Sequence, residues 1–185
     1  MSTDAEANMK KVLAVYQNSF STKVHGQENS DLDPLMSLFG ITPELKRENR
    51  QYWGRELGMC WQLVVTELFK ELANNFAPPY RDGADELCDL IDGTDAIDTK
   101  YRIGSGDSGT LKKFKQYAKI LKQINYRPVL LIVRDDNLPA AITACINGGW
   151  TVLTGDDTWE YVEQRTGFDL KTWFVASAGQ FPISN

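Results

Sequence analysis

Long hydrophobic runs are missing from this sequence. No apolar stretch approaches the roughly 18 residues that a membrane-spanning helix needs. The first residues, MSTDAEANMKK, contain no apolar segment of the kind that forms the core of a signal peptide. We therefore expect a cytoplasmic protein with no membrane span.

Histidine and cysteine are scarce. The single histidine, His25, lies in a polar region without the asparagine and histidine partners of an HNH arrangement, so we interpret it as a surface residue. Cys60, Cys88 and Cys145 are far apart and form no CxxC pair. Two of them lie in apolar runs, where cysteine commonly packs as a small hydrophobic residue. Neither a zinc site nor a structural disulfide is expected.

An excess of positive charge is also missing. A net charge of -5 and a pI of about 5.0 exclude a protein that coats nucleic acid through bulk positive charge. The charges are unevenly distributed, because from Asp98 to Arg134 nine lysine or arginine residues stand against two aspartates. Such a basic region can bind a polyanion in a salt-dependent manner. A solvated helix face would explain the same lysines without any ligand.

What is present is an ordinary globular composition, with 42% hydrophobic and 24% charged residues. A chain of 185 residues fits one domain with a single hydrophobic core. Residues 1–40 are weakly patterned, and we interpret them as a peripheral N-terminal arm. Residues 41–185 carry regular helix and strand patterns and are predicted to form one compact domain.

A long helical segment is predicted first. Thr42-Pro43-Glu44 provides the capping residue, the proline at the first helical position and the acid of a helix start. Apolar residues then recur at three- and four-residue spacing from Leu57 to Leu72. One long helix, or a broken pair of helices, should therefore end near Asn75, before Pro78-Pro79.

Strand patterns follow. Asp92-Gly93 is a strong turn pair between short apolar stretches, which predicts a β-hairpin over residues 86–103. The apolar run RPVLLIV at 127–133 is typical of a strand buried on both faces in the middle of a sheet. The other expected elements are helices over 110–124, 138–146 and 156–165 and a strand over 150–154. This alternation predicts an α/β fold with a mixed central sheet flanked by helices.

Two aspartates and a lysine on the predicted hairpin are the candidate reactive residues. Asp89 and Asp98 lie on opposite arms, so pairing across the turn would bring their carboxylates close together. Lys100 projects from the same strand face as Asp98 because side chains alternate with a period of two. Carboxylates on a rigid element hold the hard cation that phosphodiester hydrolysis requires to polarise the phosphate and activate water. The lysine would stabilise transition-state charge or orient the attacking water.

Other interpretations of these residues remain open. A D-x-K motif on its own occurs by chance in many chains, and its simplest interpretation is a surface ion pair on a strand. Asp85, Asp92 and Asp95 are rivals of Asp89 for the position of the first acid. Asp92 is typical of a turn residue, and Asp85 precedes the predicted strand.

The sequence of elements around the hairpin resembles the αβββαβ core of the PD-(D/E)XK nuclease superfamily. This resemblance makes Asp89 the first acid, Asp98 the second acid and Lys100 the lysine of the motif, with the two acids as metal ligands. Cys88 replaces the usual proline before the first acid, and the second acid is an aspartate where glutamate is more common.

The resemblance also implies a helical residue that contacts the metal or the water. Glu56 and Gln62 are the candidates for this catalytic role. Because they are six residues apart, they face different sides of one helix and cannot serve equally. A solvated helix face explains either residue as well.

Two segments resemble the ApaLI-like type II restriction endonucleases, namely the run from Asp98 to Tyr117 and the stretch Asn49-Arg-Gln-Tyr-Trp-Gly54. The resemblance extends over most of residues 40–165. It implies a nuclease domain over 41–185 that cuts both strands of double-stranded DNA at a short palindromic site, GTGCAC by resemblance alone. It further implies a Mg²⁺ cofactor, a homodimer and a cognate DNA methyltransferase encoded nearby.

Candidate DNA contacts follow the hairpin. The glycine-rich stretch 104–109 lacks a P-loop pattern and is interpreted as a flexible connection. The lysines just after it are suited to bind phosphates, a contact that positions DNA without specifying its sequence. These phosphate-binding candidates are Lys112, Lys113 and Lys115, together with Arg102. The candidates for base reading are Arg81, Arg102 and Asn137.

Two other functions compete with restriction. A repair or recombination nuclease with the same core would recognise DNA structure instead of sequence. A module that binds DNA or a partner would keep the fold without the chemistry, although the intact set of two acids and a lysine argues against loss of activity.

Overall fold

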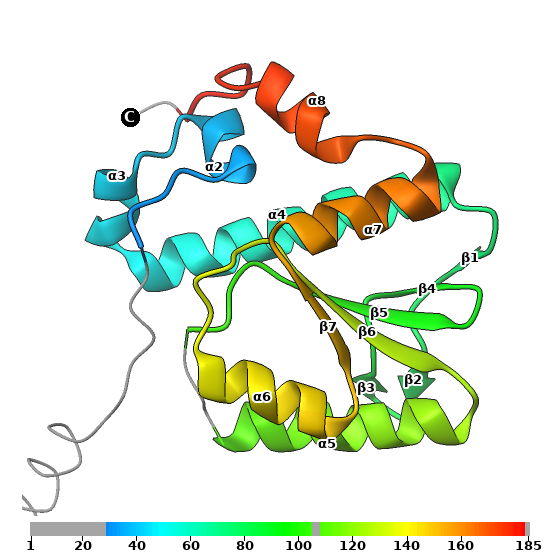
Figure 1. Ribbon diagram of the computed structural model, residues 1–185. Coiled ribbons are helices and arrows are strands. Elements are labelled where there is room, and N and C mark those ends of the chain that lie inside the picture. The colour runs from blue at the N-terminus through cyan, green and yellow to red at the C-terminus, as the bar shows by residue number, and fades with distance from the viewer. Residues whose placement is uncertain (1–28, 105–107, 184–185) are drawn as a thin grey trace, which may run out of the picture.

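The computed structural model describes residues 29–104 and 108–183, which form an α/β fold of three layers. In chain order the elements are α2 (Pro34–Phe39), α3 (Pro43–Glu48), α4 (Arg50–Leu72), β1 (Phe76–Ala77), β2 (Arg81–Asp82), β3 (Asp85–Glu86), β4 (Leu90–Asp92), β5 (Asp95–Lys100), α5 (Ser108–Gln123), β6 (Arg127–Ile132), α6 (Pro139–Gly148), β7 (Thr151–Thr154), α7 (Asp156–Thr166) and α8 (Leu170–Ala176). A central sheet is covered by α4 and α7 on one face and by α5 and α6 on the other (Figure 1). The predicted α/β fold is confirmed, whereas His25 lies outside the described residues.

The main sheet is mixed and has the order β1-β4-β5-β6-β7. β1, β4 and β5 pair antiparallel, and β5, β6 and β7 pair parallel. The predicted hairpin is confirmed, with Leu90 opposite Ile97 and Gly93 in the turn at a φ of +60°, a conformation that glycine adopts without strain. β2 and β3 form a separate two-stranded ribbon. These two strands and β1 were not predicted, because two residues carry no periodicity.

Strand β6 is buried on both faces, as its apolar run predicted. Val129 and Leu131 join the core cluster formed with α4 and α7. Leu130 and Ile132 join the second cluster, formed with α5 and α6. β6 lies between β5 and β7, so it provides β5 with a rigid parallel partner along its whole length.

The predicted helical segment consists of the short α3 followed by a single 23-residue helix, α4. The side chains of Thr42 and Asn49 cap the two helices by accepting backbone hydrogen bonds, as N-cap residues commonly do. One face of α4 is buried at four-residue spacing through Leu57, Trp61, Val65 and Phe69. This packing fixes the rotation of α4 about its axis and so decides which of its polar residues reach the hairpin. Within the described chain, no helix combines the length and apolar character needed to cross a membrane.

Helix α2 belongs to the core, although the sequence placed it in a peripheral arm over residues 1–40. Leu35, Met36 and Leu38 are buried in the same cluster as α4 and α8. The amide of Gly179 donates to the carbonyl of Ser37 at 2.9 Å, which joins the C-terminal segment to α2. The apolar partners of α2 come from distant parts of the chain, so the short apolar stretch from Leu35 to Phe39 did not by itself place it in the core.

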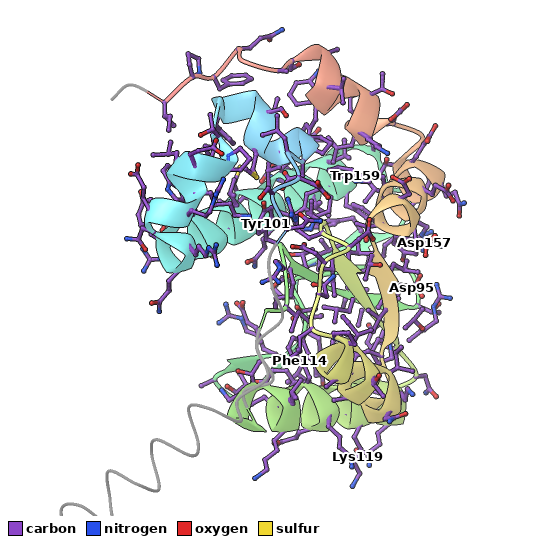
Figure 2. The ribbon with its side chains drawn as sticks, turned by 60° about the vertical axis from the view of Figure 1, so that its left-hand side comes forward. Asp95, Tyr101, Phe114, Lys119, Asp157 and Trp159 are labelled. Atoms are coloured by element: carbon purple, nitrogen blue, oxygen red, sulfur yellow. The ribbon has the colours of Figure 1, made fainter. Side chains whose placement is uncertain are left out.

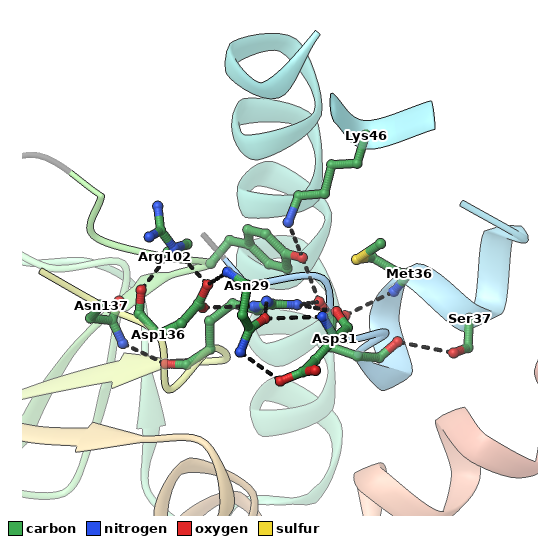
Figure 3. Close-up of polar contacts among 11 residues, drawn as sticks. Asn29, Asp31, Met36, Ser37, Lys46, Arg102, Asp136 and Asn137 are labelled. Carbon is green, nitrogen blue, oxygen red and sulfur yellow. Dashed lines mark hydrogen bonds and ion pairs between the residues drawn. The ribbon is translucent and has the colours of Figure 1, made fainter. Parts of the chain in front are cut away.

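A buried polar network connects the N-terminal segment to the ends of β5 and β6 (Figure 3). Arg134 lies at its centre and donates to Asp33 Oδ2 at 3.0 Å, to the carbonyl of Asp31 at 2.7 Å and to Asp136 Oδ1 at 2.9 Å. Tyr101, which directly follows β5, donates its hydroxyl hydrogen to Asp33. Because Tyr101 and Arg134 both bind Asp33, the network joins the end of β5 to the segment that precedes α2.

The three cysteines are free thiols, as expected. Cys88 and Cys145 are buried and Cys60 is half-buried. Burial raises the pKa of the Cys88 thiol to about 11 and also raises the pKa of the other two. All three remain protonated near neutral pH and serve as apolar packing residues.

Candidate active site

The structure brings Asp89, Asp98 and Lys100 together at the open end of the β4–β5 hairpin. The amide of Asp89 donates to the carbonyl of Ile97 at 2.8 Å, and Ile97 is also the partner of Leu90, so the chain departs from the regular β4–β5 register at Asp89. This bond holds Asp89 beside the part of β5 that carries Asp98, close enough for the two side chains to interact electrostatically. The Lys100 ammonium donates to Asp98 Oδ1 and, at 2.9 Å, to the carbonyl of Thr99.

The carboxylate of Asp89 lies at the edge of β5 and is held by two neighbours. Its Oδ1 accepts a hydrogen bond from the Gln62 amide of α4 at 2.8 Å. Its Oδ2 accepts two bonds from Thr99, one from the backbone amide and one from the hydroxyl, both at 2.7 Å. Asp89 thus takes the place of the strand backbone that would otherwise pair with Thr99.

The charges of the site are coupled. Burial disfavours the charged form of Asp98 and the nearby Asp89 repels it, while Lys100 attracts it, and the net effect raises the pKa of Asp98 to about 6. Burial also disfavours the charged form of Lys100, but Asp98 and Asp89 outweigh this effect and raise the Lys100 pKa. The site therefore contains a permanent cation beside two carboxylates that repel each other, an arrangement that a further cation would relieve.

The donor set fits a hard divalent cation. Mg²⁺ prefers oxygen ligands and commonly takes one or two carboxylates, with water and substrate phosphate completing its shell. In the described part of the chain, no group of three or more acidic, histidine or cysteine side chains is arranged to hold a metal ion. The carboxylates available to a cation here are those of Asp89 and Asp98, and two carboxylate ligands would leave positions open for water and phosphate.

Replacement of Asp98 by asparagine should change how stability depends on pH. Because the folded-state pKa is raised from 3.8 to about 6, the stabilisation from protonated Asp98 is complete below pH 4 and is lost as the pH rises through 6. Asparagine cannot ionise and keeps its contribution. The free energy of unfolding of Asp98→Asn, relative to the wild type, should rise between pH 4 and pH 7 by on the order of 2 kcal/mol.

Urea unfolding at several pH values in EDTA measures this difference without competition from a metal. Asp157→Asn, at an exposed position of α7 (Figure 2), is the matched control and should show no such rise. A relative stability of Asp98→Asn that is flat or falls with pH would contradict the prediction.

The rival acids have structural partners elsewhere. Asp92 binds Arg165 at 2.5 Å, and Asp95 accepts hydrogen bonds from Arg127 at 2.6 and 2.7 Å and from Tyr161 at 2.7 Å. Both lie at the turn end of the hairpin, away from Lys100 at the other end of β5. Asp85 lies on the exposed ribbon strand β3, 3.9 Å from Lys113. The rival acids do not join the site.

Of the two helical candidates, Gln62 contacts Asp89, whereas Glu56 pairs with its neighbour on α4. The Glu56 carboxylate pairs with Arg55 at 2.8 Å and lies beside a cavity lined by Phe39, Ile41 and Trp53. Six residues of α-helix correspond to about 600°, so Glu56 points about 120° away from Gln62. The burial of the apolar face of α4 decides between them, and it selects Gln62.

The candidate phosphate contacts differ in accessibility. The three lysines lie exposed on α5, and Phe114, between two of them, has its ring centre 5.5 Å from the Lys100 ammonium. Arg102 is largely buried and donates to the carbonyl of Asp136 at 3.0 Å. To contact DNA, the Arg102 side chain would have to break its contacts with Asp136. The exposed lysines are Lys112, Lys113 and Lys115.

The candidates for base reading also differ. The side chain of Asn137 accepts from the amide of Ile103 at 2.7 Å and donates to the carbonyl of Arg134, so it stabilises its own loop. The structure therefore does not present Asn137 for base reading. Arg81 is exposed on β2, where it forms an ion pair with Glu86.

Thr99 binds Asp89 directly, and the sequence did not suggest it as a site residue. Side-chain alternation points it to the face of β5 opposite Asp98 and Lys100. Only the exact end of β4, where Asp89 replaces the paired backbone, makes its hydroxyl a donor to that carboxylate. Its position between Asp98 and Lys100 was the only signal available.

In comparisons with known proteins, residues 81–178 match the family described as ApaLI-like restriction endonuclease. The match covers more than half of the chain and includes Asp89, Asp98, Lys100 and α5. It begins after α4, so Gln62 lies outside it. No curated protein and no solved structure matches the chain.

Proposed function

Because the chain belongs to the ApaLI-like restriction endonuclease family, we propose that it is a type II restriction endonuclease that hydrolyses double-stranded DNA with Mg²⁺. The observation that carries this proposal is the convergence of Asp89, Asp98 and Lys100 at one end of the hairpin. The order α4, β1, β4, β5, α5, β6 agrees with the αβββαβ core and supports membership of the PD-(D/E)XK superfamily.

The proposed chemistry assigns a separate role to each residue. Asp89 and Asp98 would hold Mg²⁺, which supplies a polarised phosphate and a water of lowered pKa when bound. Lys100, whose pKa is raised, remains an ammonium at neutral pH and so acts as a charge on the phosphate oxygens, not as a base. Its bond to Asp98 keeps the ammonium on the same face of β5 as that carboxylate.

Helix α5 would bind the DNA backbone beside the cleavage site. The contact between Phe114 and Lys100 places the buried face of α5 beside the site, and the lysines lie exposed on the same helix. Phosphate contacts of this kind contribute affinity and orientation for any sequence. Arg102, held by Asp136, would join them only after a rearrangement on binding.

Replacing the three α5 lysines by alanine should weaken binding to all DNA sequences alike. Each lost phosphate contact lowers the slope of log K against log salt by about 0.9, so the triple variant should lose nearly three units of slope. Fluorescence anisotropy in Ca²⁺, with cognate and unrelated duplexes at several salt concentrations, measures the affinity and its salt slope. The triple variant is Lys112→Ala, Lys113→Ala and Lys115→Ala.

The matched control is Lys70→Ala, an exposed lysine of α4 that pairs with Glu67. Its salt slope should equal that of the wild type. An unchanged slope in the triple variant would place the DNA on another face of the protein.

The restriction system implied by the family completes the proposal. The two strands of a palindromic DNA sequence are cut by two copies of the active site, which a homodimer supplies. GTGCAC is the first sequence to test. A cognate DNA methyltransferase encoded nearby would protect the host genome. Sedimentation of the purified protein with and without a GTGCAC duplex tests the dimer.

Incubation with large unmethylated phage DNA tests the function itself. Discrete fragments that form in Mg²⁺ and disappear in EDTA would support a restriction endonuclease, and mapping of their ends gives the site. A Mg²⁺-dependent smear would support a structure-specific or non-specific nuclease of the same fold. Intact DNA in the presence of Mg²⁺ or Mn²⁺ would overturn the enzyme assignment and leave a binding module.

A further inference from the structure

The carboxylate of Asp89 accepts more hydrogen bonds than its place at a strand edge requires. We propose that Thr99 and Gln62 are positioning residues that fix this carboxylate so that Oδ1 is the oxygen offered to the divalent cation. The inference rests on the proposed function and adds to it the two side chains that orient the first metal ligand.

The distribution of bonds between the two oxygens supports this assignment. A carboxylate oxygen accepts about two hydrogen bonds. Oδ2 of Asp89 already accepts two, from the amide and the hydroxyl of Thr99, both at 2.7 Å. Oδ1 accepts one, from Gln62 at 2.8 Å. The remaining capacity to bind a cation therefore belongs to Oδ1.

Thr99 is suited to hold one carboxylate orientation. It is buried, with 3% of its surface exposed, and a β-branched side chain has few available rotamers. Its hydroxyl and amide bind the same oxygen, Asp89 Oδ2, so rotation of the carboxylate would break both bonds. Its carbonyl oxygen accepts a hydrogen bond from the Lys100 ammonium at 2.9 Å. One residue thus sets the positions of Asp89 and Lys100 relative to each other.

Both residues act through Asp89. Thr99 points its side chain to the face of β5 opposite Asp98, and Gln62 approaches from α4 with its amide hydrogen directed at Asp89. Partners of this kind orient metal ligands, and their replacement typically lowers metal affinity or activity by 10–100-fold. The effect expected here is a loss of cation affinity and not of folding.

The test compares Thr99→Val, which keeps the shape and loses the hydroxyl, with Thr99→Ser, which keeps the hydroxyl. Direct titration with Mn²⁺, followed by electron paramagnetic resonance of the free ion, should show that the valine variant binds Mn²⁺ at least about 10-fold more weakly than the wild type. The serine variant should bind close to the wild-type level. The Mg²⁺ concentration for half-maximal cleavage should shift in parallel, while the rate at saturating Mg²⁺ changes less.

Gln62→Met removes the other bond with little change in volume and should weaken Mn²⁺ binding as well. It keeps the inference testable if Thr99→Val fails to fold, which circular dichroism and thermal unfolding would show. Thr151→Val, at an exposed position of β7, is the matched control and should bind Mn²⁺ as the wild type does.

The outcomes separate the inference from the proposed function. If the wild type binds Mn²⁺ and cuts DNA while Thr99→Val and Gln62→Met bind as tightly as the wild type, the positioning roles are overturned and the nuclease stands. If the wild type neither binds Mn²⁺ nor cuts DNA, the proposed function fails and the inference fails with it. Weaker binding that serine restores supports both.

Discussion

Lys100→Ala should cut DNA about a thousandfold more slowly than the wild type at saturating Mg²⁺. Removal of one donor to the negative charge of a transition state commonly costs 10²–10³ in rate. Here the lost group is also a full charge whose pKa is raised by Asp98 and Asp89. Single-turnover cleavage of a cognate duplex, with enzyme in excess, measures the chemical step directly.

The binding of DNA separates this effect from a general loss of function. Lys100 is one charge among the basic residues that follow it, so the affinity for DNA in Ca²⁺ should fall far less than the rate. Lys70→Ala, an exposed lysine on α4, should cut at the wild-type rate. Cleavage by Lys100→Ala within tenfold of the wild type would show that the lysine is only an ion-pair partner of Asp98.

Arg134→Met should be the most destabilising single change in the buried polar network. Arg134 and its partners Asp33 and Asp136 have side chains that are 4%, 9% and 9% exposed. Methionine fills most of the volume but removes the cation that pairs with Asp33 and Asp136, and Asp136 keeps Arg102 as a partner at 3.2 Å. Breaking a buried pair in this way typically costs 3–5 kcal/mol, which lowers the melting temperature of a chain of this size by about 10 °C.

Thermal and urea unfolding measure the loss, and Arg47→Met provides the comparison. Arg47 pairs with Glu44 on α3, and these side chains are 48% and 74% exposed, so its replacement should change stability by less than about 1 kcal/mol. Similar stabilities of the two variants would mean that the network contributes no more than a surface ion pair.

Replacement of Arg134 should also disturb the candidate active site. Tyr101 binds Asp33 and directly follows Lys100, and the carbonyl of Tyr101 accepts the amide of Arg134 at 3.1 Å. The end of β5 that carries Asp98 and Lys100 is therefore held by the same group. We expect Arg134→Met to lower cleavage at temperatures where the variant is still folded.

Much of the fold followed from local sequence signals. The Asp92-Gly93 turn, the Thr42-Pro43 helix start and the apolar run of β6 each depend on residues close together in the chain, and each prediction is confirmed. Helix α8 was not predicted because Leu170 and Phe174, its buried residues, form too short a pattern to stand out.

The sequence by itself determined that Asp89 and Asp98 lie near each other on the two arms of the hairpin and that Asp98 and Lys100 share a face, because turn type and strand alternation are local properties. Only the tertiary structure decided that Gln62, and not Glu56, meets Asp89, because the rotation of α4 is set by what its apolar face buries. It likewise decided that Thr99 binds Asp89 and that α2 lies in the core. These contacts join segments far apart in the chain or depend on where a strand stops, and local periodicity carries no information about either.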